Sequence, residues 1–304
     1  FTESALFFGS PEQRRRVFGV VTDPAADTRR ENAPALIFLN VGANHHVGPN
    51  RMYVILARQL AARGYVSLRF DVAGLGDSPL PPGSPENRLY SKDSVDDVKA
   101  AMTFLQQTRG TSRFVLTGLC SGAYLAFHTA IEDPRVVGQV LLNPQTFEWH
   151  DGDSLELSVR KGFLSTRYYA KALLDYRVWL RAARGKVNVV EVLGALRERL
   201  RARAGANLAV LGARLTGRPA PTTEVERAFH ALGDRGVDSL LVFSFNDGGV
   251  DMIERHLGGG ARRMRHRQNF ALVIVDDADH TFTPTASQLV LYELLERHAL
   301  SRFT

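Results

Sequence analysis

Apolar positions change their spacing repeatedly along the chain. Compact apolar runs, typical of buried strands, alternate with stretches where apolar residues recur every three or four positions. The predicted strands lie at 35–39, 65–70, 114–117 and 136–142, after an opening antiparallel pair at 6–8 and 17–21. The predicted helices lie at 52–60, 95–105 and 124–131. This alternation predicts an α/β fold with a mostly parallel sheet and helices on both faces, because each parallel crossover needs a helix to return the chain.

The alternation is interrupted after Asn143 and Pro144. From 150 to 236 we find only helical stretches rich in Leu, Ala and Arg. Strands are predicted again at 240–245 and 270–275, followed by a closing helix at 286–298. The sequence therefore predicts a core in two parts, residues 1–149 and 237–304, with a helical, Arg-rich insertion at 150–236 between them.

Charge is concentrated in that insertion. The chain of 304 residues has a net charge of +6, yet residues 160–218 hold 14 basic side chains against three acidic ones, so the remainder is slightly acidic. Two interpretations stay open, a solvated helix face and an electrostatic docking surface for an acidic partner. Nucleic-acid binding is not expected, since the arginines lack a recognised reading motif.

Composition narrows the class of protein further. With 44% apolar and 23% charged residues the chain is typical of soluble globular proteins. No apolar run approaches the roughly 18 residues that a membrane span needs, so no span is expected. A single cysteine, Cys120, excludes an intramolecular disulfide and a cysteine-based zinc site. One free thiol fits a reducing compartment, which predicts a cytoplasmic location.

That cysteine lies in the most informative motif, Gly118-Leu119-Cys120-Ser121-Gly122, between a predicted strand and a predicted helix. A nucleophile on such a turn has a strained backbone, and side chains two residues to either side would collide, so glycine is required there. The helix N-terminus and a neighbouring histidine would both favour the reactive thiolate. Ser121 is the weaker candidate for nucleophile, because Leu119 and Ala123 would then occupy the two tight positions.

On this motif the sequence resembles the α/β-hydrolase superfamily over nearly its whole length apart from the insertion. The superfamily orders its triad along the chain as nucleophile, acid and histidine. Asp247 and His280 follow the two late predicted strands, and the resemblance implies the catalytic set Cys120, Asp247 and His280. Asp251 is close enough in sequence to compete with Asp247 as the acid. The insertion occupies the place of the superfamily's lid, so we expect a helical cap there.

The resemblance also implies an oxyanion hole, a pair of amide donors for the tetrahedral intermediate. Ser121 is expected to supply the first amide, and the loop after the strand at 35–39 the second, from Val41 or Gly42. The adjacent His45 and His46 lack a third metal ligand at useful spacing, so we expect loop-stabilising or substrate-facing roles. Tyr168 and Tyr169 of the insertion are further candidates for lining a substrate pocket, and neither a metal nor a cofactor is expected.

Residues 39–78, which include the turn from Asp71 to Ser78, look like a bacterial subgroup of serine aminopeptidase-like and exosortase-system-associated hydrolases. Similar cysteine turns occur in dienelactone hydrolases and polyhydroxyalkanoate synthases, so the resemblance implies hydrolysis or acyl transfer through an acyl-cysteine. The expected substrate is a small acyl ester or thioester, the acyl group being free or carried on an acyl-carrier protein or coenzyme A. The alternative is a non-catalytic ligand-binding protein on the same scaffold.

Overall fold

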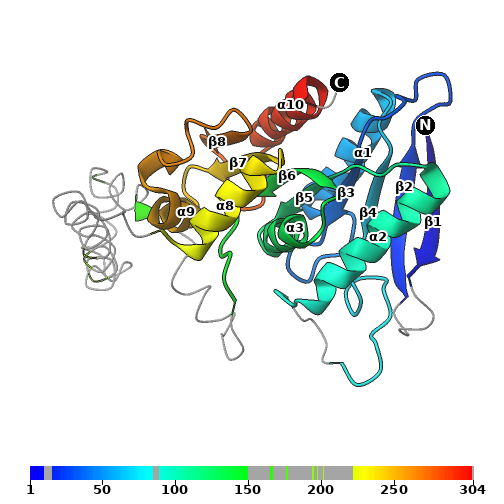
Figure 1. The fold of residues 1–304 in the computed structure, drawn as a ribbon, viewed down its shortest axis with the longest axis horizontal. Helices are drawn as coiled ribbons and strands as arrows, with labels where there is room; N and C mark the ends of the chain where they lie inside the picture. The colour runs from blue at the N-terminus through cyan, green and yellow to red at the C-terminus, as the bar shows by residue number, and fades with distance from the viewer. Residues whose placement is uncertain are drawn as a thin grey trace.

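The computed structural model describes residues 1–9, 16–84, 89–149, 165–166, 176, 194, 197, 201 and 222–302. One eight-stranded sheet organises this part of the chain (Figure 1), with strand order β1-β2-β4-β3-β5-β6-β7-β8. Its strands are β1 (Thr2–Phe8), β2 (Val17–Asp23), β3 (Ala35–Leu39), β4 (Ser67–Phe70), β5 (Phe114–Leu119), β6 (Val136–Leu142), β7 (Asp238–Ser244) and β8 (Phe270–Val275). β2 is antiparallel to β1 and β4, and the remaining neighbours are parallel. The predicted fold class is confirmed.

Helices cover both faces of the sheet, as the alternation predicted. They are α1 (Met52–Ala62), α2 (Asp93–Arg109), α3 (Ser121–Glu132), α8 (Glu224–Asp234), α9 (Gly249–Leu257) and α10 (Thr285–Arg302), with short 3-10 turns η1 (Pro49–Arg51) and η2 (Gly259–Ala261). Successive residues of β3 point to opposite faces, so Ile37 packs with α2 and α3 while Phe38 packs with α1 and α10 (Figure 1). Burial on both faces explains why these strands have apolar runs rather than alternating polar residues.

Helix α8 lies within the range that the sequence analysis assigned to the insertion. Its Phe229 packs against Phe127 of α3 and Phe270 of β8, with ring centroids 4.8 and 5.7 Å apart. This helix therefore belongs to the core packing and leads directly into β7. Most of 150–221 lies outside the described residues, so the cap and the boundaries at 149 and 236 stay predictions. Among the described residues, no helix has the length and apolar character required to cross a bilayer.

Candidate active site

The turn between β5 and α3 holds Cys120 in a conformation that ordinary residues avoid, with φ 56° and ψ −111°. Space around the turn explains both flanking glycines. A Cβ on Gly118 would lie 2.1 Å from the backbone carbon of Gly122, and one on Gly122 would lie 2.6 Å from the carbonyl oxygen of Asn40. Side chains at these two positions would force the strand, turn and helix apart. The predicted strand-turn-helix is present, and α3 begins directly at Ser121.

Cys120, His280 and Asp247 are brought together from three separate loops. The Nδ1 atom of His280 lies 2.6 Å from Oδ2 of Asp247, and Cys120 is near enough to act electrostatically on the same ring. Burial favours the neutral ring, but the hydrogen bonds and charges of Asp247 and Cys120 outweigh burial and raise the pKa of His280 from 6.5 to about 10. The arrangement therefore favours an imidazolium between two groups that can both carry negative charge.

Asp251, the competing candidate for the acid, is directed elsewhere. Its Oδ2 accepts hydrogen bonds from the amide and the hydroxyl of Thr166, each at 2.7 Å. Asp247, in contrast, is only 2% exposed, and its Oδ1 accepts from the Gln145 side chain at 2.7 Å and from the Gly249 amide at 2.8 Å. Two donors thus hold the carboxylate that faces His280.

Two residues that the sequence analysis did not single out as site residues, Asn143 and Gln145, support this pair. Asn143 donates to the carbonyl of His280 at 2.9 Å and accepts from the amide of Ser244 at 2.7 Å. Gln145 donates to Asp247, as described above. The available signal was positional, since polar residues directly after a buried parallel strand reach the edge of the sheet where sites of this fold class lie.

The two loops expected to supply the oxyanion hole meet at Gly42 and Ser121. Ser121 is 4% exposed, and the amide of Gly42 donates to its hydroxyl oxygen at 2.8 Å. Gly42 has a φ of +55° and faces open space, whereas Val41 is buried. The structure therefore brings Gly42 rather than Val41 into contact with the residue after the nucleophile turn.

The buried carboxylate of Asp71 holds the loop after β3 in place. Asp71 accepts from Asn40 at 2.7 Å and from the amide of Asp77 at 3.0 Å, and it lies 2.8 Å from Nδ1 of His46. A Cβ on Gly76 would lie 2.4 Å from Asp71, which explains the glycine in this turn. The network ties the residues on both sides of Val41 and Gly42 to β4.

His46 is 8% exposed and pairs with Asp71, so its contacts match the loop-stabilising alternative, and its substrate-facing role stays a prediction. His46, Asp71 and Asp77 also lie close enough to share a cation. Because hydrogen bonds already satisfy the buried carboxylate, the group is explained without an ion. His45 is exposed, so its substrate-facing role stays a prediction. Tyr168 and Tyr169 lie outside the described residues.

Tyr90 is a further residue of the site that the sequence analysis missed. Its hydroxyl lies 3.7 Å from the sulfur of Cys120. The ring stacks on Trp149 at 4.5 Å and meets Tyr124 edge-on at 5.2 Å. Burial, followed by the charge and hydrogen bond of Cys120, raises the pKa of Tyr90 well above its ordinary value, so the hydroxyl keeps its proton. Residue 90 follows a polar loop rather than a predicted element, and nothing in its spacing marks it.

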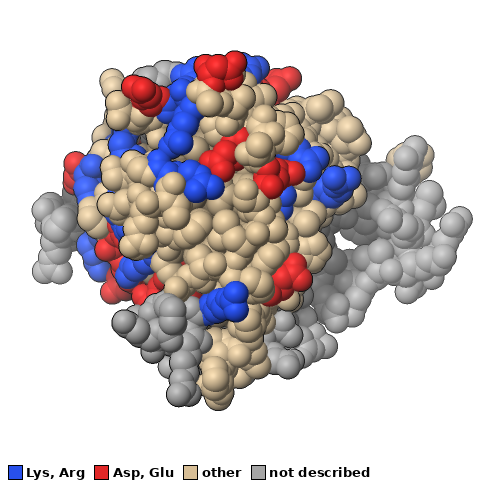
Figure 2. Space-filling model, turned by 90° about the vertical axis from the view of Figure 1, so that its right-hand side faces the viewer, with Lys and Arg blue, Asp and Glu red and all other residues tan. Residues whose placement is uncertain are grey.

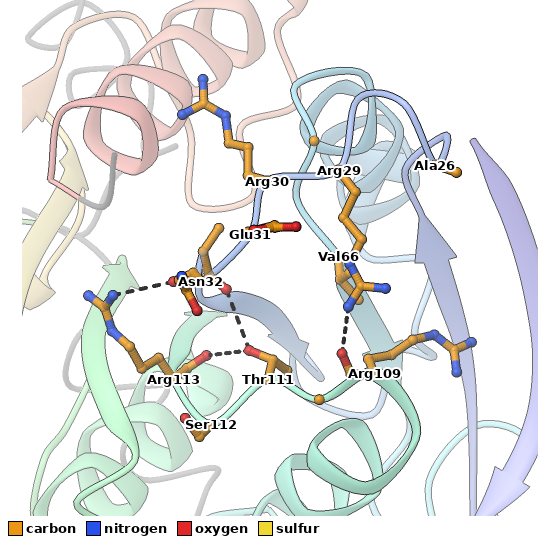
Figure 3. A pocket seen from close by; sticks show the side chains of 13 residues that line it. Ala26, Arg29, Arg30, Glu31, Asn32, Val66, Arg109, Thr111, Ser112 and Arg113 are labelled. Atoms are coloured by element: carbon orange, nitrogen blue, oxygen red, sulfur yellow. Dashed lines mark hydrogen bonds between the residues drawn. The ribbon is translucent and has the colours of Figure 1, made fainter.

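A cavity lies at the end of the sheet opposite to Cys120. It has a volume of about 470 Å³ and is lined by residues that precede β3, β4 and β5, whereas Cys120 follows β5 (Figure 3). Its arginines are engaged locally: Arg109 pairs with Asp23, Arg29 donates to the carbonyl of Arg109, and Arg113 donates to that of Asn32. This cavity is separate from the chemistry around Cys120.

Comparison with known proteins agrees with the fold. The family described as serine aminopeptidase, S33, matches residues 31–186. An alpha-beta serine hydrolase homologue from Coxiella burnetii has a TM-score of 0.55 at 14% identity, covering 98% of both chains. A hypothetical protein from Pseudomonas aeruginosa has a TM-score of 0.58 at 13% identity, covering 99% of this chain and 94% of that one. A proline iminopeptidase from Mycobacterium smegmatis has a TM-score of 0.53 at 17% identity, covering 98% of this chain and 99% of that one. No curated protein shows significant similarity to the sequence.

Proposed function

Since the chain belongs to the serine aminopeptidase S33 family and is a hydrolase of the α/β fold, we propose that it cleaves or transfers acyl groups of esters or thioesters through an acyl-cysteine on Cys120. The observation that supports the proposal is the 2.6 Å contact of His280 with the buried Asp247, together with the influence of the nearby Cys120 on the same ring. A nucleophile, a base and a group orienting that base are the three parts that covalent acyl chemistry requires.

In the proposed first step, the Cys120 thiolate attacks the acyl carbonyl carbon and forms a carbon–sulfur bond. The carbonyl electrons move to oxygen, and the resulting oxyanion is stabilised by amide donors that include Ser121. When the intermediate collapses, the bond to the leaving alcohol or thiol breaks, and the leaving group takes a proton from protonated His280. The enzyme is then acylated on sulfur and His280 is neutral.

The second step returns the enzyme to its starting state. Neutral His280 removes a proton from water, or from an alcohol or amine acceptor, as that molecule attacks the thioester carbonyl. Collapse of the second tetrahedral intermediate expels the thiolate, and the imidazolium–thiolate pair is restored. Because a thioester is more activated than the ester that serine would form, both hydrolysis and transfer are compatible with this site. The resemblance to exosortase-system-associated hydrolases supports a biosynthetic setting but names no substrate.

The carrier of the acyl group is a separate part of the proposal. Residues 160–218 hold 14 basic side chains against three acidic ones, which suits an acidic acyl-carrier protein or the phosphates of coenzyme A. On the β1 side of the molecule, in contrast, basic and acidic groups are interspersed around a neutral centre (Figure 2). A cytoplasmic location would keep the single thiol reduced.

Replacement of four arginines of this segment, Arg197, Arg199, Arg201 and Arg203, by glutamine tests the carrier. We expect the Michaelis constant to rise more for a carrier-bound thioester than for a small ester, because only the carrier has the charge that the arginines attract. An equal rise for both substrates contradicts docking through this segment.

The test of the central proposal is the mass of the intact protein after incubation with a panel of acyl thioesters. We expect one acyl adduct on the wild type, none on Cys120→Ala, and a longer-lived adduct on Cys120→Ser, whose ester is less activated. Decay of the wild-type adduct in water and in added amines separates hydrolysis from transfer. A ligand-binding protein without catalysis would give no adduct, and its thiol would react with iodoacetamide no faster than free cysteine at the same pH.

A further inference from the structure

Resting on the proposed function, we infer that the hydroxyl of Ser121 is a catalytic hydrogen-bond donor to the oxyanion, in addition to the backbone amide of the same residue. A hydroxyl group at this place was not required by the superfamily resemblance, which assigns only the amide. The Ser121 side chain has two relevant features. Its oxygen accepts a hydrogen bond, and its hydroxyl proton is not donated to any acceptor described in the structure.

The partner of the hydroxyl is the other side of the proposed oxyanion region. The amide of Gly42 donates to Oγ of Ser121 at 2.8 Å, so the oxygen acts as an acceptor in that bond. A serine hydroxyl that accepts one hydrogen bond still has its own proton to donate. Within the part of the chain that the structure describes, this hydroxyl donates to no acceptor.

A buried hydroxyl proton without a hydrogen bond is energetically unfavourable, so its presence on Ser121 points to a ligand that accepts it. Ser121 is only 4% exposed, so bulk water has little access to it. Buried polar hydrogens in native proteins are nearly always bonded, and one that is free next to a nucleophile is available for a ligand. The atom that arrives there during acyl chemistry is the carbonyl oxygen of the substrate, bound to the amide of Ser121.

The three groups form a relay that strengthens as charge develops. The Gly42 amide donates to Oγ, and Oγ in turn donates to the oxyanion beside the Ser121 amide. Each bond in such a chain polarises the next, and bonds to an ionised acceptor are about twice as strong as neutral ones. The interaction is therefore worth more in the tetrahedral intermediate than with the ground-state carbonyl, which is the condition for lowering the barrier.

The loop that holds Gly42 is fixed well enough for this role. Asn40 donates to Asp71 at 2.7 Å and accepts from the amide of Val72 at 2.8 Å, and His46 contacts the same buried carboxylate. The Gly42 amide is thus held against Ser121 by contacts on both sides of it. The opposite interpretation, in which the hydroxyl merely blocks the Gly42 amide, predicts the opposite kinetic result.

Two reactions of the same thiol separate these interpretations. Acylation of Cys120 by a thioester passes through an oxyanion, whereas alkylation by iodoacetamide displaces iodide from carbon and forms none. For Ser121→Ala we expect acylation to slow by about 10- to 100-fold, somewhat less than the loss of a full oxyanion donor, because the backbone amide of residue 121 stays in place. Alkylation is expected to stay within about twofold of wild type, which also reports that the site is folded. Ser287→Ala, which removes a hydroxyl bonded to Pro284 in α10, is the matched control and should change neither rate.

Unchanged or faster acylation of Ser121→Ala overturns the inference, and faster acylation identifies the hydroxyl as a blocking group. An equal loss in both reactions also overturns it, because Ser121 would then act on the thiol or on the fold. Failure of the proposed function looks different, since wild-type protein would form no acyl adduct and its alkylation would match that of free cysteine.

Discussion

Replacing Asp247 by asparagine should make the imidazole of His280 a weaker base. The side chain keeps its size, and the partners Gln145 and Gly249 keep an oxygen to bond, but the charge facing His280 is lost. The pKa of His280 is about 10 instead of 6.5, which corresponds to a preference of about 5 kcal/mol for the protonated ring. Asp247 and Cys120 share that preference.

If Asp247 contributes about half of it, its loss costs the protonated ring roughly 2–3 kcal/mol, or about 30- to 150-fold in the proton affinity of His280. We therefore expect iodoacetamide alkylation at pH 7 to slow in Asp247→Asn by up to about that factor, because a weaker base withdraws the thiol proton less. In acylation by a thioester, where the leaving group needs the proton of His280, the alkaline limb of the pH profile should move down from pH 10 toward 6.5. The assay is the mass of the singly alkylated or acylated protein over time, from pH 5 to 10, and one cysteine makes the product unambiguous.

Asp251→Asn is the matched control, because it removes a carboxylate four residues away that bonds Thr166 instead of His280. Its alkylation profile should match that of wild type. The reasoning is refuted if Asp247→Asn alkylates within threefold of wild type with an unmoved alkaline limb, or if Asp251→Asn shows the larger change.

Three further outcomes follow from the same contacts. Gly122→Ala should destabilise the fold by about 2–3 kcal/mol, since its methyl group would lie 2.6 Å from a backbone oxygen. The control Gly259→Ala places its methyl group more than 4 Å from any atom and should be neutral, and urea unfolding of both variants measures the difference in stability. Tyr90→Phe keeps the stacked ring but removes the hydroxyl 3.7 Å from the sulfur, so alkylation should slow by no more than about tenfold at pH 7 with little change in Tm, and a larger loss of Tm would assign Tyr90 a structural role. Because the folded pKa of His280 exceeds its unfolded value of 6.5, protonation of the ring stabilises the fold fully below pH 6.5, and this contribution is lost as pH rises toward 10. The Tm difference between wild type and His280→Gln should therefore be larger at pH 6 than at pH 9.5, and a difference independent of pH contradicts the assigned pKa.

Much of the fold was predictable because both faces of the sheet are buried. Runs such as 35–39 and 136–142 match β3 and β6 to the residue, since uninterrupted apolar strands leave a strong signal. Helix α9 was not predicted, because it is short and begins at glycine. Helix α8 was assigned to the insertion because apolar spacing does not reveal what an amphipathic helix packs against.

The residues of the candidate site were likewise predictable only in part. Gly118, Cys120 and Gly122 were predictable because steric crowding at the turn dictates their spacing. Tyr90 was not, since it reaches the site through the tertiary fold, and no local periodicity records which distant loop a side chain will meet. The burial of His46 was hidden for a similar reason, because its partner Asp71 lies in another loop, directly after β4.

The hydrogen bonds of the Asn143 side chain have a consequence for the segment of chain that follows β6. By bonding the backbone of both Ser244 and His280, this one amide joins the ends of β6 and β7 to the loop after β8. The acid and the imidazole thus keep their alignment through links that bypass residues 150–221. Grafting a shorter or foreign segment between β6 and α8 should consequently leave the pairing of Asp247 with His280 intact.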